Sequence, residues 1–326
     1  MGLAGLLAAC NTLPTAAPAV SSPADASPTP APLLTSVRYG QPSTAVQYLY
    51  LQVAQERGFY RAHGLEVERV VAPANVVAAA LSAGELAYTA GIPGGIRLAL
   101  RGLPLKIVSV ASLQEYTFVT HPAVTAPAQL RGKALAISAP GSANDRAVRA
   151  ALRHLNVEVG ELTLVALGDP SRQLQALQAG VVAGAALSLP YSVLALHEGF
   201  REWVRTDTLY RAVNTGLVAP ESRLVTRRVE VLALIRAERA AIRYLKADPV
   251  WSAAFLAERF DLAPEVARAV YARMIEGYVE TADLTELRDA LEDVIATEQA
   301  AMGLDEAGKG WAELVDPTLA AEAARS

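Results

Sequence analysis

Polar and aromatic side chains follow the predicted buried strands of this sequence, where they could hold a small molecule. In open α/β sheets, ligands bind beyond the carboxyl ends of the strands, where loops lead into helices. Hydroxyl, carboxamide and tyrosyl groups at such loops bind by hydrogen bonds and stacking, without covalent chemistry. The rule selects twelve candidate ligand-binding residues: Ser43, Thr44, Tyr48, Thr89, Gly91, Gln114, Tyr116, Ser142, Asn144, Asp145, Ser188 and Tyr191.

The turn at residues 142–145, with the sequence SAND, permits two interpretations. Backbone N–H groups at the start of the following helix could bind an anionic group. The same residues fit a capping box, in which Asp145 serves the helix itself. A carboxylate in the first turn also offsets the positive end of the helix dipole, so Asp145 would repel a sulfonate. No arginine lies on the predicted loops, and the residues therefore favour an uncharged ligand.

The sequence offers little for catalysis or metal binding. Its four histidines, at positions 63, 121, 154 and 197, are scattered and show no His-x-x-x-His spacing. The single cysteine, Cys10, excludes an intrachain disulfide and a cysteine-based zinc site. No Ser-His-Asp or Cys-His set can be assembled from the predicted loops. We therefore expect no enzyme activity, no metal and no cofactor.

A repeated segment divides the candidate residues between two halves of the chain. Residues 80–87 have the sequence ALSAGELA, and residues 176–183 have the sequence ALQAGVVA. Each predicts the last turn of a helix, a glycine that ends it, and entry into a buried strand. The separation suits two similar α/β lobes rather than a solenoid, with a ligand between them. Chance recurrence in an alanine-rich chain is the alternative.

Strands and helices alternate from residue 36, which predicts an α/β fold with mixed, mainly parallel sheets. The chain is expected to cross between lobes near residues 116–122 and 214–222. Lobe 1 would contain residues 36–119 and 217–326, and lobe 2 residues 120–216. Beyond residue 222 a helical C-terminal region is predicted, with helices at 229–246, 249–259, 264–276 and 284–302.

The composition limits the classes of protein to which the chain can belong. The 326 residues are 52% hydrophobic and 19% charged, which is typical of a folded globular chain of about two domains. A net charge of −4 gives no basic footprint for nucleic acid. Beyond residue 10, no apolar run in the sequence is long enough to cross a bilayer.

The N-terminal residues indicate a signal for export and membrane anchoring. Residues 6–10, LLAAC, resemble a bacterial lipobox, in which the cysteine is lipidated, so residues 1–10 would be a lipoprotein signal with Cys10 as the anchor. This signal is short and has no Lys or Arg, so the true start could lie upstream; an ordinary apolar N-terminus is the alternative. Residues 11–35 are rich in Pro, Ala, Ser and Thr, which predicts an extended tether.

An ordered set of motifs resembles periplasmic binding proteins of the alkanesulfonate, taurine, nitrate and thiamine-pyrimidine type. Residues 58–68, GFYRAHGLEVE, resemble their GFY-x-x-x-GL-x-V signature, and Gln129 stands where a DLRGK motif usually has Asp. The resemblance covers about residues 36–302. The other matching segments are 80–84 (ALSAG), 102–106 (GLPLK), 130–133 (LRGK), 140–142 (PGS) and 173–180 (QLQALQAG).

The resemblance implies a two-lobed periplasmic-binding-protein clamshell of type II that serves an ATP-binding-cassette importer. Its partners would be a small-molecule ligand and the permease and ATPase subunits; the protein would be a monomer, extracytoplasmic and lipid-anchored to the bacterial membrane at Cys10. We expect a planar nitrogen-containing ligand, such as a thiamine-type pyrimidine or riboflavin, stacked on Tyr48, Tyr116 and Tyr191. Alternatives are an alkanesulfonate, taurine or nitrate binding protein, a thiamine-pyrimidine synthase-like enzyme, and a ligand-sensing module without a transporter.

Overall fold

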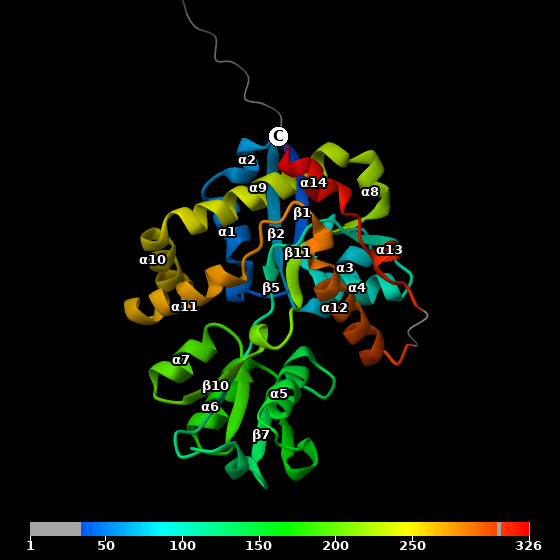
Figure 1. Cartoon of the computed structure of the whole chain (residues 1–326). Coiled ribbons are helices and arrows are strands. Elements are labelled where there is room, and N and C mark those ends of the chain that lie inside the picture. Colours follow the sequence, from blue (N-terminus) through cyan, green and yellow to red (C-terminus); the bar gives the residue numbers. More distant parts are fainter. Residues whose placement is uncertain (1–33, 305–307, 326) are drawn as a thin grey trace, which may run out of the picture. The chain divides into compact units, whose positions relative to one another are not determined.

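Two β-sheets divide the folded part of the chain into two lobes (Figure 1). The computed structural model describes residues 34–304 and 308–325, and residues from Leu34 onward form one unit. Cys10, the predicted signal and nearly all of the predicted tether lie outside the described residues. The α/β class with two lobes is confirmed.

The sheet of lobe 1 has six strands and mixed direction. The order of its hydrogen-bonded strands is β2-β1-β3-β11-β4, and the short strand β5 also pairs with β11. The first three strands pair in parallel, whereas β11 runs antiparallel to β3, β4 and β5. The strands are β1 (Thr35–Gln41), β2 (Leu65–Val71), β3 (Tyr88–Gly91), β4 (Leu105–Ile107), β5 (Ser112–Leu113) and β11 (Val213–Pro220).

The sheet of lobe 2 has five strands in the order β10-β6-β9-β7-β8. Strand β7 pairs in parallel with β8 and β9, and β6 runs antiparallel to β9 and β10. Both sheets are therefore mixed. In each sheet the first strand after a crossing between the lobes, β6 in lobe 2 and β11 in lobe 1, pairs antiparallel with its neighbours. The strands are β6 (Thr117–Thr120), β7 (Ala134–Ile137), β8 (Thr163–Ala166), β9 (Gly184–Leu187) and β10 (Arg201–Arg205).

The crossings between the lobes lie slightly before the expected positions. The expected boundary at 119/120 falls inside β6, and the one at 216/217 falls inside β11. Each of these strands bonds within a single sheet, β6 in lobe 2 and β11 in lobe 1. The chain therefore crosses at residues 114–116 and returns at residues 206–212.

The repeated segment forms the same structure in both lobes. Helix α3 (Ala74–Ser82) ends before Gly84, and helix α6 (Pro170–Gln178) ends before Gly180, with φ angles of 74° and 68°. In both copies the amide of the residue after the glycine donates to the carbonyl of the residue four positions before the glycine, at 2.9 Å. Glycine adopts this left-handed conformation without strain, which closes the helix and turns the chain into β3 or β9. The predicted helix end, glycine and following strand are confirmed in both copies.

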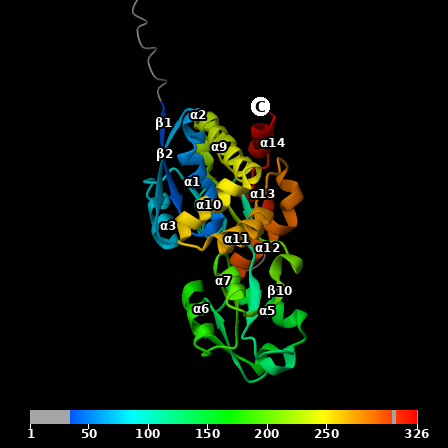
Figure 2. The same ribbon diagram turned by 90° about the vertical axis from the view of Figure 1, so that its left-hand side faces the viewer.

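Helices cover both faces of each sheet (Figures 1 and 2). In lobe 1, α1 and α9 pack on one face and α4 and α12 on the other; in lobe 2, α5 and α6 take opposite faces. The predicted C-terminal helices are confirmed. The α-helices are α1 (Leu49–Glu56), α2 (Phe59–Ala62), α3, α4 (Ile92–Leu100), α5 (Ala143–His154), α6, α7 (Tyr191–His197), α8 (Glu221–Thr226), α9 (Arg228–Ala247), α10 (Pro249–Phe260), α11 (Pro264–Gly277), α12 (Arg288–Ala301), α13 (Trp311–Leu314) and α14 (Thr318–Ala324).

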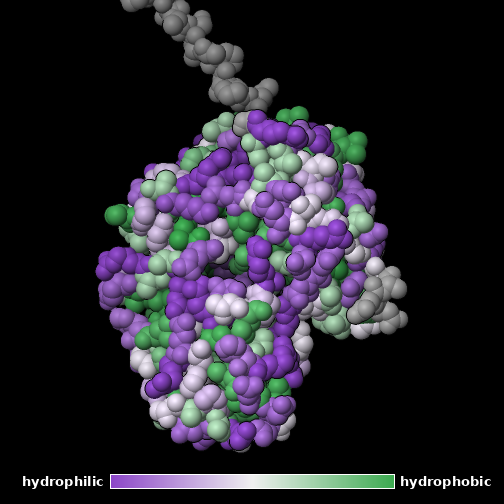
Figure 3. All heavy atoms as spheres, in the orientation of Figure 1, coloured by the Kyte–Doolittle hydropathy of each residue, from purple (hydrophilic) through white to green (hydrophobic). Residues whose placement is uncertain are grey.

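Five short 3-10 helices complete the described elements. They are η1 (Val46–Tyr48), η2 (Pro127–Leu130), η3 (Val159–Glu161), η4 (Thr206–Thr208) and η5 (Leu284–Leu287). On the face shown in Figure 3, hydrophilic residues predominate and hydrophobic ones are scattered between them. Within residues 34–304 and 308–325, no helix has the length and apolarity needed to span a membrane.

The core of lobe 1 contains a buried carboxyl group. Glu238 on α9 is 2% exposed, and burial raises its pKa from the usual 4.5 to about 8. Its Oε1 has no hydrogen-bond partner in the described structure, and neither do the hydroxyls of the buried Tyr39, Tyr50 and Tyr60. The side chain is therefore held as a neutral acid at neutral pH, because ionisation in this apolar region would be costly.

Replacing Glu238 by glutamine is expected to flatten the dependence of stability on pH. Between about pH 4.5 and 8 the unfolded chain loses this proton while the folded chain keeps it. The free energy of unfolding should therefore fall as pH rises, by about 1.4 kcal/mol per pH unit, and level off above the folded pKa. Urea unfolding at pH 5, 6.5 and 8 measures this slope in the wild type and in Glu238→Gln. The exposed Glu258→Gln is the control, and equal slopes in all three proteins would contradict the prediction.

Candidate functional site

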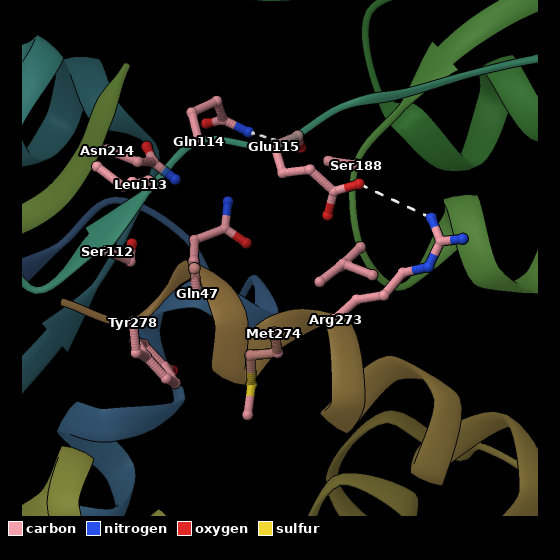
Figure 4. A pocket seen from close by; sticks show the side chains of 12 residues that line it. Gln47, Ser112, Leu113, Gln114, Glu115, Ser188, Asn214, Arg273, Met274 and Tyr278 are labelled. Atoms are coloured by element: carbon pink, nitrogen blue, oxygen red, sulfur yellow. Dashed lines mark hydrogen bonds and ion pairs between the residues drawn. The ribbon is translucent and has the colours of Figure 1, made fainter. Parts of the chain in front are cut away.

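A cavity lies between the lobes, beside both crossings (Figure 4). Lobe 1 contributes residues from η1, β5, β11 and the end of α11, and lobe 2 contributes the loop after β9. Its volume is about 30 Å³, which is room for roughly two water molecules. The lining residues are Gln47, Ser112, Leu113, Gln114, Glu115, Ser188, Leu189, Asn214, Arg273, Met274, Gly277 and Tyr278.

Arg273, on α11, is the cationic side chain of this lining. Its Nη1 donates to Thr117 Oγ1 at 3.0 Å, and its Nη2 donates to Glu202 Oε2 at 2.5 Å. Glu115 Oε1 lies 3.8 Å from Nη1. The prediction that no arginine lies on the loops after the strands does not cover this side chain, because Arg273 reaches the cavity from helix α11. The guanidinium is nevertheless already occupied by two carboxylates and a hydroxyl.

Glu115 is the anionic side chain of the lining. Its carboxylate accepts a hydrogen bond from Thr117 Oγ1 at 2.8 Å and lies 3.7 Å from Arg205 Nε. Burial raises its pKa, and the two arginines oppose that shift. One carboxyl and one guanidinium thus lie within ion-pair distance of each other in the lining, so their charges largely cancel.

The remaining polar groups of the lining are uncharged. Gln47, Gln114 and Asn214 contribute carboxamides, and Ser112, Ser188 and Tyr278 contribute hydroxyls. Gln114 Nε2 donates to the Glu115 carbonyl at 3.3 Å, whereas Asn214 Nδ2 has no partner in the described structure. Such groups recognise hydrogen-bonding atoms on a ligand without requiring a net charge.

Ion pairs join the lobes on both sides of the cavity. Arg205 of β10 bonds Glu276 of α11 at 2.8 Å, next to the pair of Arg273 with Glu202. On α5, Arg146 bonds Asp293 and Thr297 of α12. Val193 of α7, in lobe 2, is also buried in the apolar cluster of lobe 1. These contacts hold the two lobes together beside the cavity, an arrangement that we call the closed form.

Two of the twelve predicted ligand residues, Gln114 and Ser188, line this cavity. Ser43 and Thr44 are exposed at the end of β1, and Ser43 Oγ accepts from its own turn at 3.3 Å. Thr89 is buried, and its Oγ1 accepts from the Gly91 amide at 3.4 Å. For the residues outside the lining, a role in binding stays a prediction.

The three predicted stacking tyrosines lie in apolar clusters. Tyr48 is 6% exposed within the core of lobe 1, and a Cβ on Gly91 would approach its hydroxyl to 3.5 Å. Tyr116 and Tyr191 are half-buried against two different clusters of lobe 2. Burial raises the pKa of all three hydroxyls. None of their rings belongs to the cavity lining.

The turn at residues 142–145 is engaged in capping α5. Ser142 Oγ accepts from the Asp145 amide at 3.2 Å, and Asp145 accepts from the Gly141 amide at 2.9 Å and from Arg149 Nε at 2.8 Å. Asn144 joins two strand ends, because it accepts from the Ser138 amide at 2.7 Å and donates to the β9 carbonyl of residue 186. These bonds support the capping interpretation of Ser142 and Asp145.

Six polar lining residues were not among the predicted ones: Gln47, Ser112, Glu115, Asn214, Arg273 and Tyr278. Asn214 had a usable signal, since it is a carboxamide in a mainly apolar strand at a predicted crossing. Arg273 had none, because α11 reaches the cavity only through the tertiary fold. Among the residues that the structure describes, no group of three or more His, Cys, Asp or Glu side chains could hold a metal ion.

Comparison with known proteins gives a consistent result. A family model described as NMT1/THI5-like matches residues 45–252. The chain is similar to a protein designated periplasmic sulfonate-binding protein SsuA from Methylobacillus flagellatus KT, with 15% identity over 90% of this chain and 94% of that chain and a TM-score of 0.71. It is similar to the periplasmic nitrate-binding protein NrtA from Synechocystis PCC 6803, with 14% identity, coverage of 90% and 89%, and a TM-score of 0.68.

The same fold also occurs in an enzyme. The desulfurization enzyme DSZB has 15% identity to this chain, coverage of 89% and 99%, and a TM-score of 0.67. No curated protein sequence matches the chain significantly. The fold alone therefore does not separate binding from catalysis.

Proposed function

Because the chain belongs to the NMT1/THI5-like family, we propose that it is the extracytoplasmic solute-binding protein of an ATP-binding-cassette importer. The observation that supports this most directly is the cavity between the lobes, lined by residues of both lobes and of a crossing. Ligand bound there would contact both lobes and favour the closed form, which a permease would recognise. The lobes must separate to admit a ligand, because about 30 Å³ is too small for one.

The chemistry of the cavity supports an uncharged ligand that carries nitrogen or oxygen acceptors, such as a thiamine-type pyrimidine or riboflavin. Arg273 is already paired with Glu202 and Glu115, so an anion would find no free cation in the lining. The carboxamides of Gln47 and Asn214 have no hydrogen-bond partner among the described residues that would compete with a ligand. The family match and the two binding-protein structures support an alkanesulfonate, taurine or nitrate ligand equally well.

Other parts of the proposal concern location and partners. Cys10 would be lipidated, residues 11–35 would be the tether, and the protein would act as a monomer beside permease and ATPase subunits. Catalysis has one structural argument in its favour, the shared fold of DSZB. Against it, the lining of the cavity holds neither cysteine nor histidine, the usual nucleophile and general base. A ligand-sensing role without a transporter would use the same cavity, so the cavity does not distinguish sensing from transport.

Thermal unfolding of residues 34–326 against a ligand panel tests the proposal. The panel holds a hydroxymethyl aminopyrimidine, a formylamino-pyrimidine, thiamine, riboflavin, taurine, alkanesulfonates and nitrate. A ligand at about a hundred times its Kd should add about 2.7 kcal/mol to the free energy of unfolding. We expect a shift with a pyrimidine or riboflavin. A shift with taurine, alkanesulfonates or nitrate alone would contradict the uncharged ligand, and turnover of any compound would contradict a pure binding role.

A further inference from the structure

Asn214 is a buried carboxamide whose donor group is unused. It lies near the start of β11, immediately after the return crossing, and is 8% exposed. No acceptor in the described structure lies within hydrogen-bond distance of its Nδ2. A buried donor without a partner is destabilising, because it has lost its bonds to water. Such a group requires an explanation, and one explanation is a bound molecule that completes its hydrogen bond.

The position of Asn214 directs this donor toward the cavity. Figure 4 shows its Nδ2 turned to the space beside the Gln47 and Gln114 carboxamides. The adjacent Thr215 instead bonds Ser112 within the sheet, with 2.7 Å between the hydroxyl oxygens. The neighbouring side chain is therefore satisfied inside lobe 1, and the unpaired donor of Asn214 faces the cavity.

The other buried groups without partners do not share this environment. In the described part of the chain they are the hydroxyls of Tyr39, Tyr50, Tyr60 and Ser192, one nitrogen of Arg236 and one oxygen of Glu238. None of them belongs to a residue that lines the cavity between the lobes. Asn214 thus combines an unused donor with a place in the lining.

We propose that Asn214 anchors the ligand in lobe 1, by donating a hydrogen bond from Nδ2 to an acceptor atom of the ligand. The inference rests on the proposed binding function. It names the chemistry that the ligand must present at this point: a carbonyl oxygen, an unprotonated ring nitrogen or an oxygen of an oxyanion. Because Asn214 follows directly after the return crossing at residues 206–212, the ligand would be fixed close to the place about which the lobes move.

Asn214→Ala separates this role from a structural one, because the two roles predict opposite effects on the ligand-free protein. Without ligand, the variant should unfold at the same temperature as the wild type or slightly higher, since an unpaired buried donor is removed. Its affinity for whichever compound shifts the wild type (riboflavin, a pyrimidine, taurine or nitrate) should fall about tenfold to a hundredfold by calorimetry. Asn75→Ala, the same change at an exposed site on α3, should alter neither quantity.

Asn214→Asp identifies the kind of acceptor while preserving the shape of the side chain. It replaces the donor by a carboxylate, so taurine or nitrate should lose more affinity than a neutral pyrimidine or riboflavin. Unchanged affinity in Asn214→Ala would overturn the inference, and so would a fall of several degrees in its ligand-free unfolding temperature. If no compound binds the wild type, the proposed ligands fail, while the ligand-free comparison still decides whether Asn214 has a structural partner.

Discussion

Replacing Gly216 by alanine is expected to lower the free energy of unfolding by about 3 kcal/mol or more. A Cβ at this position of β11 would lie 2.1 Å from the carbonyl oxygen of Ser109 and 2.9 Å from Cα of Val110. Both are backbone atoms of the segment between β4 and β5, so no side chain can move aside. To relieve the clash, β11 would have to move away from this segment. Such a movement is opposed by the hydrogen bond that the amide of Leu217 donates to the Ser109 carbonyl at 3.2 Å.

Urea unfolding of residues 34–326 measures this effect. Gly94→Ala is the matched control, because a Cβ there meets no atom within 4 Å and the residue lies inside α4. Alanine in a helix is favoured over glycine by up to about 1 kcal/mol, so the control should be neutral or stabilising. Equal midpoints for Gly216→Ala and the wild type would show that β11 is free to shift in its sheet.

Reversing the charge of Arg273 is expected to open the lobes. Arg273→Glu would place a third carboxylate beside Glu202 and Glu115, next to the existing pair of Arg205 with Glu276. The Arg273 side chain is only 21% exposed, so solvent screens this repulsion incompletely. We expect the closed form to lose about 2 kcal/mol relative to the open form, a change of roughly thirtyfold in their ratio.

The distance between spin labels, one on each lobe, measures the opening. The unit from residue 34 contains no cysteine, so Val181→Cys in lobe 2 and Val250→Cys in lobe 1 label it specifically at exposed positions. The double variant with Glu202→Arg should restore much of the short distance. Arg131→Glu, which breaks a pair with Glu161 inside lobe 2, is the control. An unchanged distance in Arg273→Glu would show that these ion pairs do not hold the lobes together.

Local sequence patterns predicted the elements well where the chain itself carries the signal. The glycine that ends α3 and its counterpart after α6 follow from backbone conformation, and the long helices α9 to α11 follow from their apolar spacing. Gln114 and Ser188 reach the cavity because the rule about strand ends depends only on topology. These features need no knowledge of which distant segments meet.

The rest of the site depends on distant contacts. Arg273 comes from a helix that packs beside the cavity only after the chain has returned from lobe 2. Tyr116 precedes β6 and Tyr191 begins α7, and both rings pack against the apolar clusters of lobe 2, because a large ring is stabilised most where it loses most contact with water. The direction of a side chain at a loop cannot be predicted from its position in the sequence.

The place of β11 in its sheet dictates an order of folding. It lies between β3 and β4, yet it is made only after all of lobe 2. During synthesis, the strands of lobe 2 can pair as soon as β10 is complete, whereas the sheet of lobe 1 keeps a gap at its centre until β11 arrives. Lobe 2 should therefore mature first although lobe 1 begins first, and the unfilled sheet is the stage at which nascent chains are most exposed to aggregation or to capture by chaperones.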